Sequence, residues 1–480
     1  MTINSKAFRV KSNQQQPNII LLVMDAGRAD HLSCYGYARP TTPHIDQIAT
    51  EGTLYEKALS AAVWTVPSHA SLFTGMYLSG HGLRGRSLKL RQNIPTLASF
   101  LSGLGYDTLA LTANALIGQA TGLARGFAEL KDVRNVFQGE RLPGWQKTGN
   151  ALYRRLYYGR SPHKQSWYDS GAWRLNYDMK RWIGQRKGGQ RPFFIFANYM
   201  EPHLRYDPPR AFRRRFLTPA QEQRWQQVNQ NAWKFMSGEV TMSADDWDIL
   251  TRLYDAELAY LDGRIGELHQ FLRQNDLLDN TILIITADHG ENLGDHNLMD
   301  HQYCVYETLA RVPLIVRYPE QFPAGLRSQD LVQSVDLLPT LAEIISAQDD
   351  PTLARVQGQS LRPASLETNA REFAVTEYLA PQLHSFRREG VEFDAKLSRQ
   401  LRAIRTQRHK FIWASDGEHE LYDLAQDPNE CWNLIETERG TAVDLANKLE
   451  DWVTQHTIAA DEEAQMDEAV VSRLEALGYI

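Results

Sequence analysis

The chain has 480 residues, which predicts two or three domains of ordinary size or one large α/β domain with an addition. Its net charge of −6 argues against a nucleic-acid-binding protein, and its 42% apolar residues exclude wholesale disorder. Its cysteines, Cys34, Cys304 and Cys431, are too few and too far apart for a disulfide framework.

The first residues of the chain are polar and contain no apolar stretch typical of a secretory signal. The first strong apolar run, at 19–24, is too short to span a membrane. We therefore expect a cytoplasmic protein with no membrane span. The sequence predicts no particular oligomeric state.

The N-terminal two-thirds of the chain alternates predicted strands and helices. A continuous apolar run at 18–24 is typical of a strand buried on both faces of a parallel sheet. Similar patterns predict further strands at 108–112, 193–199, 282–286 and 313–317, and helices at 43–52, 66–75, 94–104 and 253–275. This alternation favours the α/β class, with a large, mostly parallel sheet sandwiched by helices.

The pattern changes at about residue 350. Short strands are predicted at 373–378, 401–406 and 409–413, followed by the segment 420–424 and by helices at 440–456 and 470–480. We expect a catalytic α/β domain over 1–349 and a C-terminal α+β subdomain with an antiparallel sheet over 350–480.

Two segments, 131–190 and 205–245, have weak periodicity and many basic residues. We interpret them as insertions over one edge of the sheet. Their basic clusters are either a solvated face or an anion-binding surface.

Polar residues follow three of the predicted strands. Asp25 follows the first, Glu201-Pro202-His203 follows the strand at 193–199, and Asp288-His289 follows the strand at 282–286. Sites in open α/β sheets lie at the carboxyl ends of strands, and Asp and His are ligands for divalent cations. Taken alone, each of these residues is more often a helix cap or a turn residue than a metal ligand.

Thr65 stands where the helix at 66–75 should begin. One interpretation is an N-cap, because a Thr hydroxyl bonds the free N–H groups of the first turn. The other is a nucleophile, since the positive end of the helix dipole stabilises an oxyanion at this position.

With these residues in place, the chain resembles the sulfatase family of the alkaline phosphatase superfamily over nearly its whole length. The matching blocks occur in the family's order: NIILLVMDAGRADHLSCYGY, TTPHIDQIATEGTLYEKALSAAVWTVPSHASLFTG, FANYMEPH, YDAELAYLDGRIGELHQFL, TADHGENLGDH, YETLARVPLIV and RAIRTQRHKFIW with ELYDLAQDPNECWNL. The resemblance implies a metal-bound nucleophile in the large domain and a four-stranded antiparallel sheet in the smaller one.

The chain departs from the family's pattern at the residues that serve sulfate. Sulfatases oxidise a Cys or Ser to formylglycine, whereas Thr65 carries a methyl group on Cβ and cannot give that aldehyde. The motif's Arg is His69, and two Lys positions fall at Asn114 and His301. The second of two adjacent Asp residues is Ala26.

At these positions the chain resembles the phosphoester branch of the superfamily. This branch contains the nucleotide pyrophosphatases/phosphodiesterases and the phosphoglycerol or phosphoethanolamine transferases, which use a metal-bound Thr. The resemblance implies one divalent cation (Mn²⁺, Mg²⁺, Ca²⁺ or Zn²⁺), no formylglycine, and this site: metal ligands Asp25, Thr65, Asp288 and His289, catalytic Thr65, His203 and His301, and substrate contacts His69 and Asn114. The alternative for each histidine, His296 included, is a purely structural role. A second metal site formed by Glu201, His203 and His301 is the less favoured arrangement.

We therefore expect a metal-dependent phosphomonoester or phosphodiester hydrolase, or a phosphoryl transferase. Its substrate would be a small-molecule, lipid or sugar phosphoester. The alternatives are a sulfatase that works without formylglycine and a non-catalytic binding protein with this fold.

Overall fold

The computed structural model describes residues 16–84, 88–133, 170–186, 191–361 and 371–457. The predicted helix at 470–480 and most of the insertion at 131–190 lie outside these ranges.

A nine-stranded mixed sheet forms the centre of the described structure. The order is β11-β2-β10-β6-β1-β5-β3-β4, and β9 pairs with β2. The strands are β1 (Asn18–Met24), β2 (Thr53–Leu59), β3 (Asp107–Thr112), β4 (Glu129–Asp132), β5 (Phe193–Tyr199), β6 (Thr281–Ala287), β9 (Arg311–Val312), β10 (Leu314–Arg317) and β11 (Leu326–Gln333). The predicted α/β class, with a mostly parallel sheet, is confirmed.

One predicted strand, β10, runs antiparallel to both β6 and β2. The chain leaves β6 through the short elements β7 (Asn292–Leu293), β8 (Met299–Asp300) and α11 (Glu307–Ala310). No crossover helix returns it to the other edge of the sheet, so it re-enters in the opposite direction. The sequence does not predict β2 or β11, because charged residues such as Lys57 and Asp330 interrupt their apolar pattern.

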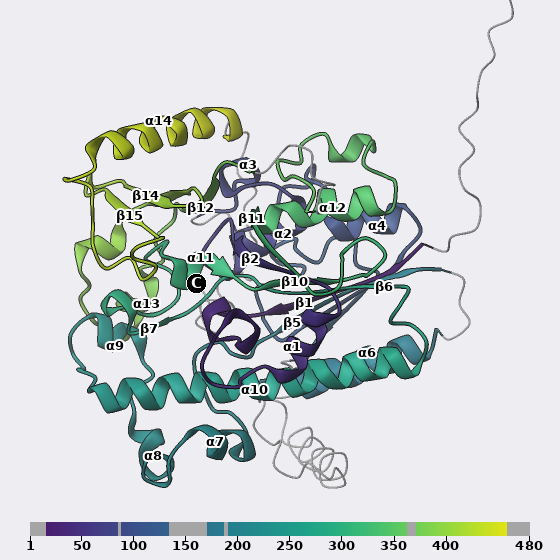
Figure 1. The fold of residues 1–480 in the computed structure, drawn as a ribbon, viewed down its shortest axis with the longest axis horizontal. Coiled ribbons are helices and arrows are strands. Elements are labelled where there is room, and N and C mark those ends of the chain that lie inside the picture. The colour runs from purple at the N-terminus through teal and green to yellow at the C-terminus, as the bar shows by residue number, and fades with distance from the viewer. Residues whose placement is uncertain (1–15, 85–87, 134–169, 187–190, 362–370, 458–480) are drawn as a thin grey trace, which may run out of the picture.

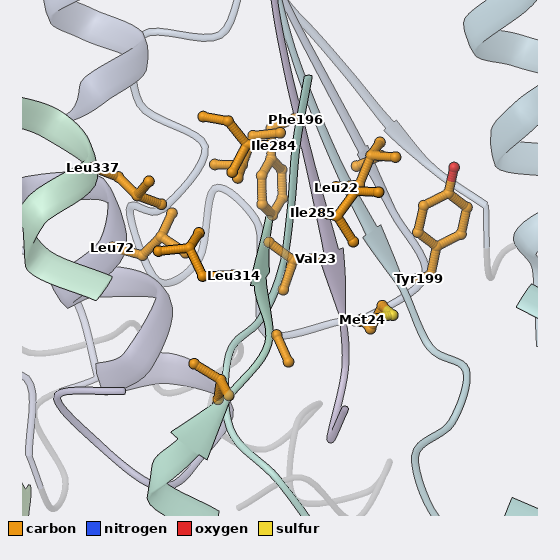
Figure 2. Close-up of a cluster of buried hydrophobic side chains, with 14 of the residues drawn as sticks. Leu22, Val23, Met24, Leu72, Phe196, Tyr199, Ile284, Ile285, Leu314 and Leu337 are labelled. Carbon is orange, nitrogen blue, oxygen red and sulfur yellow. The ribbon is translucent and has the colours of Figure 1, made fainter. Parts of the chain in front are cut away.

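Helices cover both faces of this sheet (Figure 1). The helices on one face are α1 (Pro43–Thr50), α6 (Ala172–Gly184) and α10 (Ala244–Gln274); those on the other are α2 (Thr65–Thr74), α4 (Leu97–Gly103) and α12 (Leu337–Ile344). Figure 2 shows why helices pack on both faces of the sheet. On β1, the Val23 side chain points towards Leu72 and Leu337, whereas Leu22 and Met24 point to the opposite side. Both faces of a central strand are therefore apolar.

Helix α10 begins nine residues before the predicted start, because the Ser243 hydroxyl and the Asp246 carboxylate form a capping box there. The insertion at 205–245 contains α7 (Arg210–Phe216), α8 (Pro219–Arg224) and α9 (Ala232–Met236). Phe216 of α7 packs on Ala256 and Ala259 of α10. This part of the insertion therefore covers α10, and the expectation that it lies on a sheet edge is wrong.

The C-terminal part contains an antiparallel sheet in the order β12 (Ala374–Tyr378), β13 (Leu401–Arg405), β14 (His409–Ala414) and β15 (Glu420–Asp423), as predicted. Helix α14 (Arg439–His456) packs Leu445 and Trp452 against it.

The remaining helical turns are α3 (Leu78–His81), α13 (His384–Glu389), η1 (Ala29–His31), η2 (Ser33–Tyr35), η4 (Trp225–Gln227), η5 (Asp295–Asn297), η6 (Ser334–Asp336), η7 (Pro351–Leu353) and η8 (Ala395–Ser398). None of the described helices combines the length and apolar composition needed to cross a membrane.

Candidate active site

The site lies where the three central parallel strands β6, β1 and β5 end. In the strand register Met24 is level with both Ala287 and Tyr199, so Asp25 and Asp288 follow directly at the same edge. The backbone turns sharply here, because Ala26 has a left-handed φ of 62° and its N–H donates to Asp288 Oδ1 at 3.2 Å. The sequence-based expectation that these residues meet at one edge of the sheet is confirmed.

Asp25, Asp288 and His289 are fully buried, and their ligand atoms lie within 4.8 Å of one another. His289 Nε2 is 3.3 Å from Asp288 Oδ2 and 3.8 Å from Asp25 Oδ1. Among the described residues, none of these three atoms has a hydrogen-bond partner. Three buried polar atoms without donors, converging from three side chains, fit a divalent cation, since burial without compensation is costly.

The other polar atoms of this ligand group are held by the protein. Asn114 and Asn198 donate to Asp25 Oδ2 at 2.8 and 3.2 Å, and the His289 N–H donates to Asp288 Oδ1 at 3.0 Å. His289 Nδ1 donates to the Gly290 carbonyl at 2.9 Å, which leaves Nε2 as the free lone pair. Asn198 could not be identified from the sequence, because an Asn inside an apolar strand has no motif of its own.

The electrostatics of this group follow from burial. Burial opposes ionisation of Asp25, but His203, His289 and His69 together lower its pKa below the ordinary value. Burial, followed by the charge of Asp25, raises the pKa of Asp288 well above its ordinary value. Burial and the neighbouring His301 lower the pKa of His289. Without a cation, burial and the neighbouring charges therefore oppose a negative charge on Asp288 and a positive charge on His289.

Thr65 is the first residue of α2, and Trp64 occupies the N-cap position. The Thr65 side chain makes no capping hydrogen bond, so the N-cap interpretation is wrong. The first turn of α2 is tied to the ligand group, because the Ser68 hydroxyl donates to the Asp288 carbonyl at 2.5 Å. The Thr65 hydroxyl therefore does not cap the helix. It lies on a helical turn that contacts the ligand residue Asp288.

His69 and Asn114, the predicted substrate contacts, both lie against the ligand group. His69 Nδ1 is 2.8 Å from the Thr65 carbonyl and 3.5 Å from Asp288 Oδ2. Its ring is fully buried beside Phe73 and Phe196. Asn114 orients Asp25, as described above. Substrate binding by either residue stays a prediction.

His203 and His301 come together beside the first ligand group. Their ring centroids are 4.9 Å apart, and the His301 ring stacks on His289 at 4.4 Å. Burial opposes protonation of His301, but Asp300 beside it raises the pKa of His301 to about 9. Asp300 was missed in the sequence, although Asp300-His301 repeats the Asp-His pair at 288–289 a short distance further along the chain.

Two further candidates from the sequence lie elsewhere. Glu201 accepts hydrogen bonds from the N–H groups of Ser170 (2.9 Å) and Ala172 (3.4 Å) at the start of α6, so its carboxylate is used structurally. His296 stacks on Tyr306 with ring centroids 3.7 Å apart, and both line a separate cavity of about 410 Å³ against the C-terminal sheet.

The chain is similar to known proteins over most of its length. Residues 17–347 match the family model described as Sulfatase, and residues 294–457 match N-sulphoglucosamine sulphohydrolase, C-terminal. The chain is 26% identical to an arylsulfatase of Clostridium perfringens, over 88% of this chain and 91% of that one. It is 23% identical to the multifunctional alkaline phosphatase superfamily protein PehA of Trinickia caryophylli, over 92% and 95% of the two chains. Its fold is similar to that of a phosphonate monoester hydrolase of Agrobacterium radiobacter (TM-score 0.72, 22% identity, 93% and 98% covered).

Proposed function

Since the chain belongs to the sulfatase family and is an ester hydrolase, we propose that it cleaves phosphomonoesters or phosphodiesters, with Thr65 as nucleophile. The observation that carries this proposal is Thr65 itself. It stands at the start of α2 without a capping bond, on a turn that contacts the group Asp25, Asp288 and His289. A Thr at this position cannot become formylglycine.

In the proposed reaction, Asp25, Asp288 and His289 hold one divalent cation, Mn²⁺, Mg²⁺, Ca²⁺ or Zn²⁺, beside Thr65. The chemistry that such a cation supplies when bound is neutralisation of charge on a phosphoryl oxygen. Asn114 and Asn198 keep Asp25 Oδ1 free for it by holding Oδ2. The first turn of α2 adds the favourable field of a helix N-terminus.

The Thr65 hydroxyl passes its proton to water as Oγ1 forms a bond to phosphorus and the bond to the leaving oxygen breaks on the opposite side. His203 or His301 protonates the leaving oxygen, which contributes roughly 10²–10⁴-fold to the rate. Water then attacks the phosphorus of phospho-Thr65, restores the Thr65 hydroxyl, and releases phosphate from a monoester substrate or a phosphomonoester from a diester substrate. An acceptor alcohol in place of water would complete a transfer, but we favour hydrolysis of a small-molecule, lipid or sugar phosphoester.

Phosphorus is favoured over sulfur for a chemical reason. A formylglycine hydrate can expel sulfate by collapsing to the aldehyde, whereas a Thr sulfate ester has no such exit. A Thr phosphate ester can be hydrolysed by water attacking phosphorus, where a bound divalent cation would neutralise the charge on the phosphoryl oxygens. The basic sulfate contacts are also replaced by His69, Asn114 and His301.

Sulfate ester hydrolysis without formylglycine is the second candidate, because the curated relatives include an arylsulfatase. The deciding experiment compares kcat/KM on matched 4-nitrophenyl esters: the phosphate, the bis-phosphodiester, the phenylphosphonate and the sulfate. Each is assayed with each of the four cations. We expect turnover of at least one phosphorus ester well above that of the sulfate. A preference for the sulfate would overturn the proposal.

A further inference from the structure

One tyrosine of α10 holds the turn that follows Asp25. The Tyr254 hydroxyl donates to the Ala26 carbonyl at 2.8 Å, although the two residues are 228 positions apart in the chain. The same hydroxyl accepts from the Arg28 N–H at 2.8 Å. Arg28 Nη1 donates in turn to the Glu291 carbonyl at 3.0 Å, so this chain of hydrogen bonds reaches the loop after β6.

Ala26 has a strained backbone in this turn. Its φ of 62° lies in the left-handed region, which a residue with a Cβ avoids unless its surroundings impose that conformation. The Gly27 N–H donates to the Met24 carbonyl at 3.2 Å and closes the turn around Asp25 and Ala26. The Tyr254 hydroxyl holds the Ala26 carbonyl in this conformation.

The conformation of Ala26 affects two of the candidate metal ligands. Asp25 directly precedes Ala26, and the Ala26 N–H donates to Asp288 Oδ1 at 3.2 Å. The other oxygen of that carboxylate, Oδ2, is one of the three converging atoms without a hydrogen-bond partner among the described residues. A change of φ at Ala26 turns its N–H relative to its carbonyl, so the bonds to Asp288 and to Tyr254 depend on the same left-handed conformation.

The side chain of Tyr254 is itself fixed in place. It is fully buried and packs edge-on against His31 and Tyr206, with ring centroids 5.1 and 5.5 Å away. His31 is bound by Asp255, the next residue of α10, with Nδ1 2.9 Å from Oδ1. Burial raises the pKa of Tyr254 well above its ordinary value, so the hydroxyl keeps the proton that it donates.

We propose that Tyr254 is a positioning residue of the cation site: its hydroxyl keeps Ala26 in the left-handed conformation and thereby orients Asp25 and Asp288. The inference rests on the proposed cation site of Asp25, Asp288 and His289. Residues that orient metal ligands through hydrogen bonds typically contribute about 10–100-fold to metal affinity.

The test is Tyr254→Phe, which removes the hydroxyl and keeps the ring. Isothermal titration calorimetry of the metal-stripped protein with Mn²⁺ should show a Kd about 10-fold higher or more, for the binding step that Asp288→Asn abolishes. The matched control is Tyr106→Phe. Tyr106 is 2% exposed, and its hydroxyl donates to the Pro17 carbonyl at 3.1 Å, at the amino end of β1. The control should keep the Kd of the wild type, because the bond that it loses lies at the opposite end of the strand from Asp25.

A rescue variant separates positioning from a general loss of stability. Glycine enters the left-handed region without a clash at Cβ, so Ala26→Gly in the Tyr254→Phe background should recover part of the lost Mn²⁺ affinity. An equal Kd in the wild type and Tyr254→Phe would overturn the inference, and so would a double variant that binds no better than Tyr254→Phe.

A wild type that binds no Mn²⁺ would contradict the cation site, and the crystal structure of metal-free Tyr254→Phe would then decide the role of Tyr254. Ala26 outside the left-handed region supports that role. Ala26 with an unchanged φ and an intact bond to Asp288 overturns it. None of these measurements needs a substrate, so this inference and the proposed function can fail separately.

Discussion

At the scale of single residues, Thr65 is the side chain on which the proposed chemistry depends. Thr65→Ala removes the only atom that attacks phosphorus, so kcat should fall by roughly 10³-fold or more. Thr65→Ser should retain part of the activity, because a primary hydroxyl can attack as well. The measurement is kcat on the best phosphorus ester of the panel.

The matched control is Thr50→Ala, a Thr at the exposed end of α1 whose hydroxyl donates only to the Gln47 carbonyl. It should leave kcat unchanged. Undiminished activity in Thr65→Ala would exclude Thr65 as the nucleophile.

Asp288 allows a second residue-scale test. Asp288→Asn keeps the size and the acceptor oxygen of the side chain but removes its charge. It should abolish cation binding at the candidate metal site, as measured by calorimetry with Mn²⁺, and leave the circular dichroism spectrum unchanged. Full occupancy of that site in this variant would exclude Asp288 as a ligand.

The same variant tests the electrostatics of the metal-free protein. Burial and Asp25 raise the pKa of Asp288 in the folded state, so the fold binds its proton more tightly than the unfolded chain does. Stability should therefore fall as pH rises from the ordinary Asp value of 3.8 through the raised pKa. Asp288→Asn should lack this part of the pH dependence of Tm, measured in EDTA. An identical pH dependence of Tm in the wild type and in Asp288→Asn would contradict the raised pKa of Asp288.

At the scale of elements, α1 depends on a carboxylate from another helix. Asp262 of α10 accepts from the N–H groups of Ile45 and His44 at 2.8 and 3.2 Å, at the start of α1. Thr42, the N-cap residue, makes no capping bond of its own because its hydroxyl donates to Asp46. The first turn of α1 is thus held by α10, which also explains why a short helix with a weak local cap is stable here.

Asp262→Ala should leave both N–H groups without an acceptor, at a cost of about 1–3 kcal/mol each where they are buried. The expected result is a lower Tm by differential scanning calorimetry. Asp262→Asn is the control, because one acceptor oxygen remains, and its Tm should fall less. An equal loss in both variants would show that the hydrogen bonds are not what holds the helix.

At the scale of the whole molecule, the C-terminal sheet supports the segment that leads to Thr65. The Glu377 N–H donates to the Ala61 carbonyl at 2.9 Å, and the Thr376 hydroxyl donates to the Ser60 carbonyl at 2.7 Å. The candidate metal ligands and the neighbouring His203 and His301 come from residues between 25 and 301. The described C-terminal part therefore contributes support to the site, and none of these residues.

A buried ion pair network joins the same two parts. Lys410 of β14 is 1% exposed and contacts Glu307 at 3.1 Å and Glu430 at 2.8 Å. Lys410→Met would leave the buried Glu430 carboxylate without its cation, beside the half-buried Glu307, so the free energy of unfolding should fall by about 3–5 kcal/mol. The measurement is urea unfolding at pH 8.

Lys448→Met is the matched control, since Lys448 pairs with Glu372 at the surface. Its free energy of unfolding should change by no more than about 1 kcal/mol. A Lys410→Met protein as stable as this control would show that the network does not hold the two parts together.

The amino-acid sequence predicts the strand ends that carry Asp25, Asp288 and His289, because a buried parallel strand is a local apolar pattern and its carboxyl end has a known place in the sheet. It also determined the family, through motifs that lie in order along the chain. Tertiary contacts set the direction of β10, the use of Glu201 at α6, the absence of a capping bond at Thr65 and the proximity of His203 to Asp300. These features depend on left-handed backbone turns and on loops from distant parts of the chain, and no local pattern of residues records which atoms such loops bring together.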